Sequence, residues 1–191
     1  MKDTITPTEA QEILKKHIHE AHLIAHMRET EVIMRALARH FGEDEDFWGI
    51  TGLLHDLDYE EVGMDCTKHG YQTGEILKEE GYDIPEMFRA IKSHCEGLEG
   101  CDTARESKME YCLAAAENIT GIISAYALVR PEKKIAGTKP KSLTKKLKDK
   151  SFAANVNRDS VNDIEKAGLE RSEFLAIAIA AVEEIADEVG L

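Results

Sequence analysis

The chain has 191 residues and a formal net charge of −13 at pH 7. This length corresponds to about one domain, and a hydrophobic content of 42% is ordinary for a globular protein that builds a core without disulfides. The negative charge argues against a nucleic-acid backbone as the main partner. Because the N-terminus lacks an apolar signal region and no run of about 18 apolar residues occurs, we expect a cytoplasmic protein that does not span a membrane.

Cysteine usage supports the same expectation. The chain contains Cys66, Cys95, Cys101 and Cys112, and none of them forms a CxxC pair. We therefore expect reduced thiols rather than a disulfide framework.

One segment departs from the acidic character of the chain. Residues 130–150 contain nine Lys or Arg and two acidic residues, so this segment carries +7 and the remainder −20. Such a segment would attract a small anion, although a solvated charge run is the simpler interpretation.

In chain order, every segment shows a helical pattern. Thr6 and Glu9 form a capping box with Pro7 as the first helical residue, which predicts a helix running towards His17. A second helix is expected over residues 20–41, ended by Gly42, with His26 on its apolar face.

The third expected helix, over residues 46–57, is apolar nearly all round and should therefore be central. Gly49 and Gly52 would let neighbouring helices approach closely. His55 and Asp56 lie at its C-terminal end, and residues 59–65 are expected to form a loop.

Further helices complete the chain. A helix over residues 67–80 carries His69, a helix beginning near Pro85 carries His94, and a capping box at Ser107 and Glu110 begins a long helix that ends before Pro131. On this long helix, one side is expected to present Leu113, Glu117, Thr120 and Ser124. Helices are also expected over residues 142–148, 155–166 and 172–189. No segment alternates like a strand, so the predicted fold is a compact, single-domain, all-α helical bundle.

The stretch with the clearest chemistry is residues 52–60, where an apolar run ends in His55 and Asp56. An isolated ionised carboxylate is not tolerated in an apolar interior. Imidazole nitrogen and carboxylate oxygen are both good ligands for divalent transition metals, so a metal ion would be a suitable partner. Ligands on several helices can converge in the core of a bundle.

Further candidate ligands are His26, His69, His94 and Glu117. Each has a simpler alternative when taken singly. A buried histidine on a helix stripe can be a hydrogen-bonded core residue, and Glu117 beside Ala114–Ala116 can face solvent. The order and spacing of the whole set favour a metal site.

This order resembles the HD-domain superfamily of metal-dependent phosphohydrolases. The resemblance is carried by the residues His26, His55-Asp56, His69, His94 and a final acid at Glu117. The sequence segments HMRETE, GLLHDLDY, AIKSH and ENITG around them also match the family. It covers about residues 20–125. The remaining residues, about 126–191, are expected to form a C-terminal helical extension, so that residues 1–191 make a single HD domain. This C-terminal part resembles an uncharacterised bacterial and archaeal branch of the superfamily.

The resemblance implies a ligand set. One metal ion would be held by His26, His55, Asp56 and the final acid, which is usually Asp in the family and is Glu117 here. In family members with two additional histidines, which correspond to His69 and His94, a second ion is bound and the aspartate that corresponds to Asp56 bridges the two.

The chemistry of such a site fits hydrolysis. A divalent ion lowers the pKa of bound water, and two ions can stabilise an in-line phosphoryl displacement. Mixed histidine and carboxylate ligands suit Mn²⁺, Fe²⁺, Co²⁺, Ni²⁺ or Zn²⁺. We assign His55, Asp56 and Asp58 to the catalytic centre, with Asp58 orienting a ligand histidine.

Candidate phosphate contacts are Lys68, Lys92, Lys150 and Arg158, for which a surface role is the alternative. The predicted function is hydrolysis of a small phosphorylated metabolite such as a nucleotide or dinucleotide. The alternatives are a non-catalytic or regulatory metal-binding HD protein and a mixed-valent di-iron oxygenase. We expect no membrane or nucleic-acid partner and allow for a homodimer.

Overall fold

The computed structural model describes residues 1–63, 65 and 67–191, and this part of the chain contains helices and no strands. The all-α prediction is therefore confirmed. The α-helices are α1 (Pro7–His17), α2 (Ala21–Phe41), α3 (Glu45–Leu54), α4 (Tyr59–Val62), α5 (Tyr71–Glu79), α6 (Pro85–Ser93), α7 (Lys108–Val129), α8 (Pro140–Lys148), α9 (Arg158–Asn162), α10 (Arg171–Glu184) and α11 (Ala186–Val189). A 3₁₀ helix, η1 (Asp163–Ala167), follows α9.

Local capping signals define several of these helix ends. Both predicted capping boxes are present, with the Thr6 side chain bonded to Glu9 at the start of α1 and the Ser107 side chain bonded to Glu110 at the start of α7. Helix α2 ends at Gly42, whose φ of 72° is left-handed as the predicted C-terminus requires.

Helix α3 is shorter than predicted. It ends at Leu54, and residues 55–58 form a turn that leads into the short helix α4, where a loop was expected. The prediction of a loop over residues 59–65 is therefore wrong for Tyr59–Val62. Met64, which belongs to this predicted loop, lies outside the described residues. Cys66 lies outside them as well, so the prediction that its thiol is reduced is not tested.

Helix α5 also differs from its prediction. It begins at Tyr71, because Gly70 has a φ of 79° and interrupts the helical backbone. His69 consequently lies in the turn before α5 and not on a helix face. This turn directs the His69 side chain into the protein, where it is 3% exposed.

The C-terminal region is more divided than predicted. The segment predicted as one helix over residues 155–166 consists of α9 and η1, and α9 is capped by Asn157. The helix predicted over residues 172–189 is broken at Ile185 into α10 and α11. The break places Glu188 against Arg28 of α2, with 2.6 Å between Oε1 and Nε.

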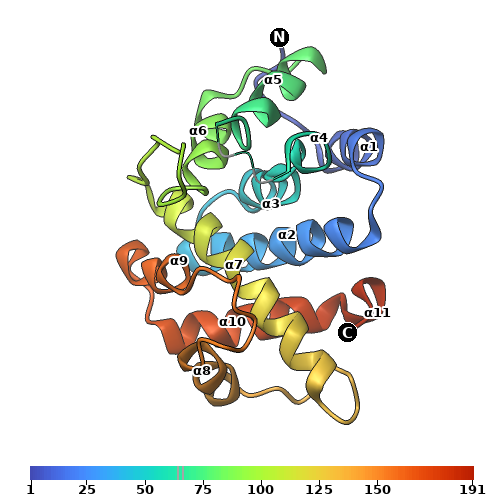
Figure 1. Ribbon diagram of the computed structural model, residues 1–191. Coiled ribbons are helices and arrows are strands. Elements are labelled where there is room, and N and C mark those ends of the chain that lie inside the picture. The colour runs from blue at the N-terminus through green and yellow to red at the C-terminus, as the bar shows by residue number, and fades with distance from the viewer. Residues whose placement is uncertain (64, 66) are drawn as a thin grey trace.

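Helix α2 runs through the middle of the molecule, as Figure 1 shows. Helices α1 and α3–α6 lie on one side of it, α8–α10 lie on the other, and α7 crosses the bundle (Figure 1). Helix α3 packs closely against α2 at two glycines. A Cβ at Gly49 would lie 2.5 Å from the Arg35 side chain, and one at Gly52 would lie 3.0 Å from Met34. The predicted close approach at both glycines is therefore confirmed.

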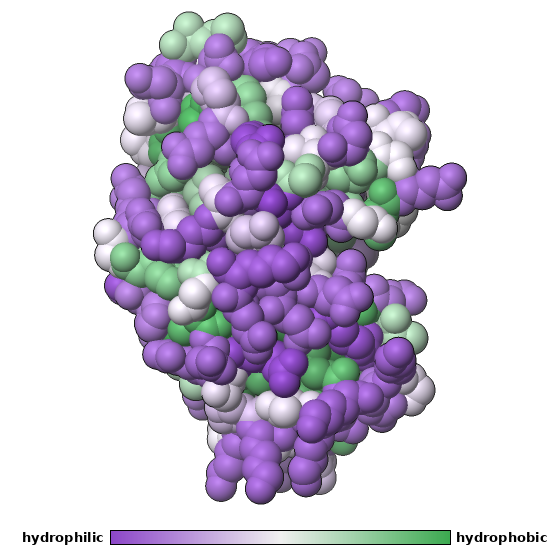
Figure 2. All heavy atoms as spheres, turned by 90° about the vertical axis from the view of Figure 1, so that its left-hand side faces the viewer, coloured by the Kyte–Doolittle hydropathy of each residue, from purple (hydrophilic) through white to green (hydrophobic). Residues whose placement is uncertain are grey.

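Helix α7 is the one described helix long and apolar enough to cross a membrane. It is a core helix of the bundle, because Cys112, Leu113, Ala114–Ala116 and Ile119 on it are completely buried. The face of the molecule in Figure 2 is in contrast mostly hydrophilic, with apolar residues scattered between polar ones.

Two hydrophobic clusters fill the bundle, and α2 contributes to both. Leu23 and Met27 pack with α1, α3, α5 and α6, whereas Ile33, Met34 and Leu37 pack with α7 and the C-terminal helices. His26 lies on α2 next to Met27. The predicted site residues are therefore carried by elements that two packed cores hold in place.

Candidate metal centre

The six predicted metal ligands come from five parts of the fold. These are His26 in α2, His55 and Asp56 at the end of α3, His69 in the turn before α5, His94 directly after α6, and Glu117 in α7. Although they span 92 positions of sequence, their side chains meet at one place between the helices. This convergence is the main finding about the site.

Asp56 lies at the centre of the group. Its Oδ1 atom is 3.3 Å from Nε2 of His55, 3.4 Å from Nε2 of His69 and 3.5 Å from Nε2 of His94. Its Oδ2 atom is 3.5 Å from Nε2 of His26. One carboxylate thus faces four imidazole nitrogens and is placed to be shared by two ions.

The four histidines form two pairs around this carboxylate. The Nε2 atoms of His26 and His55 are 3.2 Å apart, and those of His69 and His94 are also 3.2 Å apart. The carboxylate of Glu117 belongs to the first pair, since one ligand atom from each of the three residues lies within 4.8 Å of the others.

The other ring nitrogen of each histidine faces a hydrogen-bond acceptor, which fixes the tautomer. The Nδ1 partners are Gly52 O at 2.7 Å for His55, Asp58 Oδ1 at 2.7 Å for His69, Ile91 O for His94, and Thr120 Oγ1 at 2.8 Å for His26. The Thr120 hydroxyl donates its own hydrogen to Glu117 O at 2.6 Å and so accepts from His26. Every Nδ1 therefore carries a hydrogen, and Nε2 is the atom of each imidazole that faces Asp56 and that offers a lone pair to an ion when the ring is neutral.

This arrangement tests whether the residues fit a metal ion. When both imidazoles of a pair are neutral, their Nε2 lone pairs face each other at 3.2 Å and have no hydrogen to share between them. Such buried acceptors are costly when unsatisfied. A cation close to each pair satisfies both lone pairs and the Asp56 charge, so the donor set fits divalent transition metals.

Electrostatics at Asp56 and His55 agree with this fit. Burial would raise the pKa of Asp56, but the imidazoles grouped around its carboxylate outweigh burial and hold that pKa well below its usual value. Burial lowers the pKa of His55 to about 3, which keeps its imidazole neutral. A carboxylate and a neutral imidazole are the protonation states that metal binding requires.

At His69 the balance is different. Burial would lower the pKa of His69, but its hydrogen bond to Asp58 outweighs burial and raises that pKa to about 9. The carboxylate of Asp58 is completely buried and also accepts from the backbone N–H of Gly70 at 2.8 Å and of Thr73 at 3.0 Å. Asp58 thus lies behind a candidate ligand, where it orients the imidazole.

Glu117 has a longer side chain than aspartate, and its carboxyl group lies in a poorly solvated environment. Burial raises the pKa of its carboxyl group to about 7, and the amide of the neighbouring Asn118 donates to its Oε1. The completely buried Ala114–Ala116 segment precedes it on α7. The longer side chain of glutamate therefore extends from a tightly packed helix towards His26 and His55.

Replacing Glu117 with glutamine is expected to weaken metal binding about 10- to 100-fold, because the amide removes the negative charge and keeps the size. Glu117→Asp is expected to retain metal, since it retains the carboxylate. Isothermal titration of the metal-free protein measures both affinities. A Glu117→Gln variant that binds as tightly as the parent would exclude Glu117 from the ligands.

Two residues that sequence patterns did not single out also lie at the site. Cys95 is buried beside His69 and His94, with its Sγ atom 3.4 Å from His94 Nε2. Burial would raise the pKa of Cys95, but the charge of His94 and hydrogen bonds from both histidines lower it to about 6. Its position directly after a predicted ligand was the available signal. Ser160 had no such signal, and its buried Oγ has no hydrogen-bond partner.

Five of the six candidate ligands, all except His55, line a cavity of about 530 Å³. Besides the ligand side chains, the walls include Leu23, Tyr59, Leu98, Asn118, Asn155, Asn157 and Ser160. Within the described residues, no Lys or Arg lines the cavity. The walls are therefore apolar or polar without positive charge.

The predicted phosphate contacts lie elsewhere. All five N–H donors of the half-buried Arg158 bond to main-chain carbonyl groups of residues 147–156, so its guanidinium ties this segment together, and its phosphate role stays a prediction. Lys68 is exposed and lies 3.3 Å from Asp65, and Lys92 lies over the Tyr71 ring. Lys150 is exposed. For the three lysines the prediction is not tested.

A helical core that directs imidazole and carboxylate donors at a single point has the donor set of a histidine–carboxylate metal site. Comparison with protein families identifies the family: the model of the HD domain matches residues 23–122, just over half of the chain. The chain belongs to the HD-domain family, as the sequence resemblance predicted. The matched range contains all six predicted ligands. No curated protein and no solved structure matches the chain. Family membership and the ligand clusters support divalent-metal binding and a metal-dependent hydrolase type of activity.

Proposed function

We propose that this protein is a metal-dependent phosphohydrolase of a small phosphorylated metabolite. The observation that carries the proposal is the convergence of four Nε2 lone pairs on the Asp56 carboxylate at the wall of a cavity of about 530 Å³. A cavity of this size accommodates a small organic molecule. The reaction would take place where the cavity meets the ligands.

The proposed ligands divide into two groups that share Asp56. His26, His55 and Glu117 would hold one ion, and His69 and His94 a second. When bound, a divalent transition metal lowers the pKa of water to near neutrality and neutralises developing charge on phosphoryl oxygens.

The remaining residues of the site act by positioning. Asp58 accepts the Nδ1 hydrogen of His69, and Thr120 accepts that of His26, so both imidazoles keep the Nε2 lone pair directed into the site. Gly52 and Ile91 do the same for His55 and His94 through their carbonyl groups. The protein itself supplies all four acceptors, and preorganisation of this kind lowers the cost of binding.

The charges of the cavity indicate the class of substrate. Three carboxylates, those of Asp56, Glu96 and Glu117, line it, and no Lys or Arg does so within the described residues. Two divalent ions would carry a charge of about +4, which offsets the three carboxylates and leaves about +1 for the substrate, far less than the charge of a polyphosphate. The proposed substrate is therefore a phosphomonoester, with a nucleoside monophosphate as the first compound to test.

The organic part of the substrate would contact the uncharged wall. Ser160 supplies a buried hydroxyl without a partner, while Asn155 and Asn157 supply amide groups. Leu23 and Tyr59 supply apolar surface. A cytoplasmic setting belongs to the same proposal.

Phosphate release tests the proposal. The protein is loaded with Mn²⁺ or Zn²⁺ under anaerobic conditions and incubated with a panel of nucleoside mono-, di- and triphosphates and sugar phosphates. We expect metal-dependent phosphate release, fastest from monophosphates. The matched control is an Asp56→Asn variant purified in the same way, which reveals contaminating phosphatase.

Two results would contradict the proposal. Oxygen uptake coupled to substrate loss, without phosphate release, would indicate an oxygenase. Full metal occupancy without turnover of any compound in the panel would favour a non-catalytic metal-binding role.

A further inference from the structure

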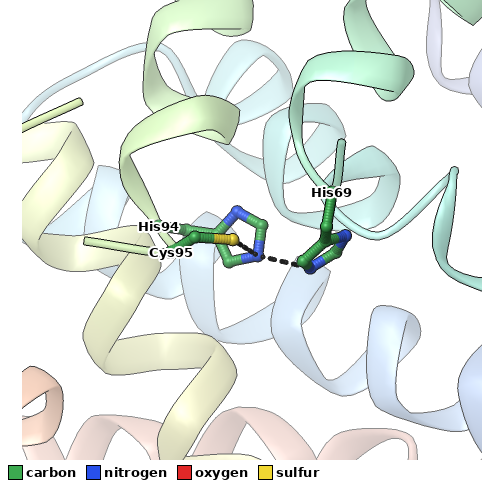
Figure 3. A group of neighbouring side chains, drawn as sticks. All are labelled: His69, His94 and Cys95. Carbon is green, nitrogen blue, oxygen red and sulfur yellow. Dashed lines mark hydrogen bonds between the residues drawn. The ribbon is translucent and has the colours of Figure 1, made fainter. Parts of the chain in front are cut away.

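The half of the site around His69 and His94 contains a third donor of a different chemical type. Cys95 is 2% exposed, and its Sγ atom lies 3.4 Å from Nε2 of His94. One ligand atom from each of the three residues lies within 4.8 Å of the others. In Figure 3 dashed lines join the Cys95 sulfur to a nitrogen of the His94 ring, and that nitrogen to the His69 ring.

We propose that Cys95 is a protein ligand of the ion bound at His69 and His94. This half of the centre is then a nitrogen–sulfur–oxygen site completed by Asp56, whereas the half around His26, His55 and Glu117 offers only nitrogen and oxygen. Thiolate selects thiophilic ions such as Zn²⁺, Co²⁺ or Fe²⁺ over Mn²⁺ and Mg²⁺. The two halves therefore differ in metal preference.

The spacing of the donor atoms supports the inference. In a tetrahedral zinc site with Zn–N of about 2.0–2.1 Å and Zn–S of about 2.3 Å, two nitrogens lie about 3.3 Å apart and nitrogen and sulfur about 3.5 Å apart. The corresponding distances here are 3.2 Å between the Nε2 atoms of His69 and His94 and 3.4 Å between His94 Nε2 and Cys95 Sγ. The distances from Asp56 Oδ1 to the same two nitrogens are 3.4 and 3.5 Å. Each of these four distances matches the spacing of neighbouring ligand atoms on one tetrahedral ion.

The backbone that carries His94 and Cys95 is held firmly. Nη1 of the buried Arg105 side chain donates to the carbonyl oxygens of Ser93 and His94, at 3.2 Å each, and its Nη2 donates to Asp163 at 3.1 Å. The backbone N–H of Arg105 donates to Glu96 at 2.9 Å. The turn after α6 is thus tied to η1, so the two donors keep their relative positions without an ion.

Two other described cysteines are placed differently and serve as references. Cys101 is half-buried, and its Sγ atom lies 3.5 Å from Lys92 O. Cys112 is completely buried in the apolar core of α7. Neither belongs to a group of metal-ligand side chains among the described residues.

Cobalt titration of the metal-free protein tests the inference. It rests on metal binding at the proposed site but not on hydrolysis, so absorption spectra measure it independently of turnover. We expect visible Co²⁺ ligand-field bands together with a near-ultraviolet sulfur-to-cobalt charge-transfer band. Cys95→Ser is expected to lose the charge-transfer band and keep the ligand-field bands. Cys101→Ala is the matched control and is expected to keep both, and Cys66→Ala is measured beside it because Cys66 lies outside the described residues.

Competition between metals provides a second measurement. Cys95→Ser removes a ligand and nearly preserves the size of the side chain. Loss of a residue that supports a ligand weakens metal binding about 10- to 100-fold, so loss of a ligand should lower the Zn²⁺ affinity at one of the two sites by at least as much. Mn²⁺ affinity should change much less.

The outcomes separate this inference from the proposed function. Ligand-field bands in the parent protein without a charge-transfer band would overturn the role of Cys95 and leave the histidine–carboxylate centre intact. Loss of the charge-transfer band in Cys101→Ala or Cys66→Ala, with its retention in Cys95→Ser, would also overturn it. Absence of all cobalt bands would overturn the metal centre and the role of Cys95 together, whatever the phosphate-release assay shows.

Discussion

Replacing Asp56 with alanine is expected to remove bound metal and to lower metal-dependent hydrolysis by about 1000-fold or more, since metal ions supply several kcal/mol of transition-state stabilisation. The reason is the position of Asp56 between the two histidine pairs. Its Oδ1 faces His55, His69 and His94, and its Oδ2 faces His26. Removing this one carboxylate leaves both halves of the site without their shared oxygen ligand.

Metal content and activity are measured on the same preparations, by elemental analysis after purification without chelator and by phosphate release. Asp83→Ala is the matched control, because Asp83 is an exposed aspartate outside the site. We expect parent-like metal content and activity from the control. Full metal occupancy in Asp56→Ala would refute the assignment of Asp56 as a ligand.

Thermal unfolding provides a readout that does not depend on turnover. A ligand that binds only the folded state stabilises it by about 2.7 kcal/mol at a free concentration 100 times its dissociation constant. We therefore expect added Zn²⁺ to raise the Tm of the parent protein and of Asp83→Ala. The Tm of Asp56→Ala should not respond.

Features of the fold that depend on neighbouring residues were predictable from sequence. The capping boxes at Thr6 and Ser107 act within one helical turn, and Gly42 ends α2 through its own backbone conformation. The side of α7 that carries Glu117, Thr120 and Ser124 was also predictable from helical periodicity. The structure shows this side facing α2, with Thr120 bonded to His26 and Ser124 bonded to Glu29.

Features that depend on distant residues were not predictable in this way. The start of α5 is set by Asp58, which accepts backbone hydrogens from Gly70 and Thr73 across the intervening residues. Arg158 looked like a phosphate ligand because its type suits one, but folding surrounds it with carbonyl groups. Residue type alone does not show which donors the fold has already used.

The same reasoning applies to the candidate site. The histidines and acids were recognisable by their order, because the family resemblance links them. Cys95 and Ser160 belong to no such pattern. Their proximity to the other residues follows from the turn after α6 and from the position of α9, which only the packed structure defines.

The second large effect is expected at Asp58, where one substitution should mainly lower stability and another should mainly weaken metal binding. Asp58→Ala removes the acceptor of three buried hydrogens, from the backbone of Gly70 and Thr73 and from His69 Nδ1. Each unsatisfied buried group costs about 1–3 kcal/mol, so we expect a loss of about 3 kcal/mol or more in the free energy of unfolding. Urea denaturation of the metal-free protein measures this loss.

Asp58→Asn is expected to lower the free energy of unfolding less than Asp58→Ala does and to act mainly on metal binding. Its amide oxygen can still accept the two backbone hydrogens at the start of α5, but its NH₂ group then faces His69 Nδ1 at the position of Oδ1. An NH₂ group donates, so His69 must accept at Nδ1 and carry its hydrogen on Nε2. The Nε2 lone pair that faces Asp56 and His94 is then lost, although the ring remains in place.

We therefore expect Asp58→Asn to fold but to bind one metal ion about 10- to 100-fold more weakly, the range for loss of a residue that orients a ligand. The ion at His26 and His55 should be retained, because their Nδ1 atoms bond to Thr120 and Gly52 and not to Asp58. Equilibrium dialysis near the dissociation constant of the weaker site distinguishes one ion from two. Asp65→Asn, an exposed aspartate in the same connecting segment, is the control and should bind like the parent. If Asp58→Asn keeps the parent's stoichiometry and both affinities, Asp58 does not set the His69 tautomer, and the second ion does not depend on His69 Nε2.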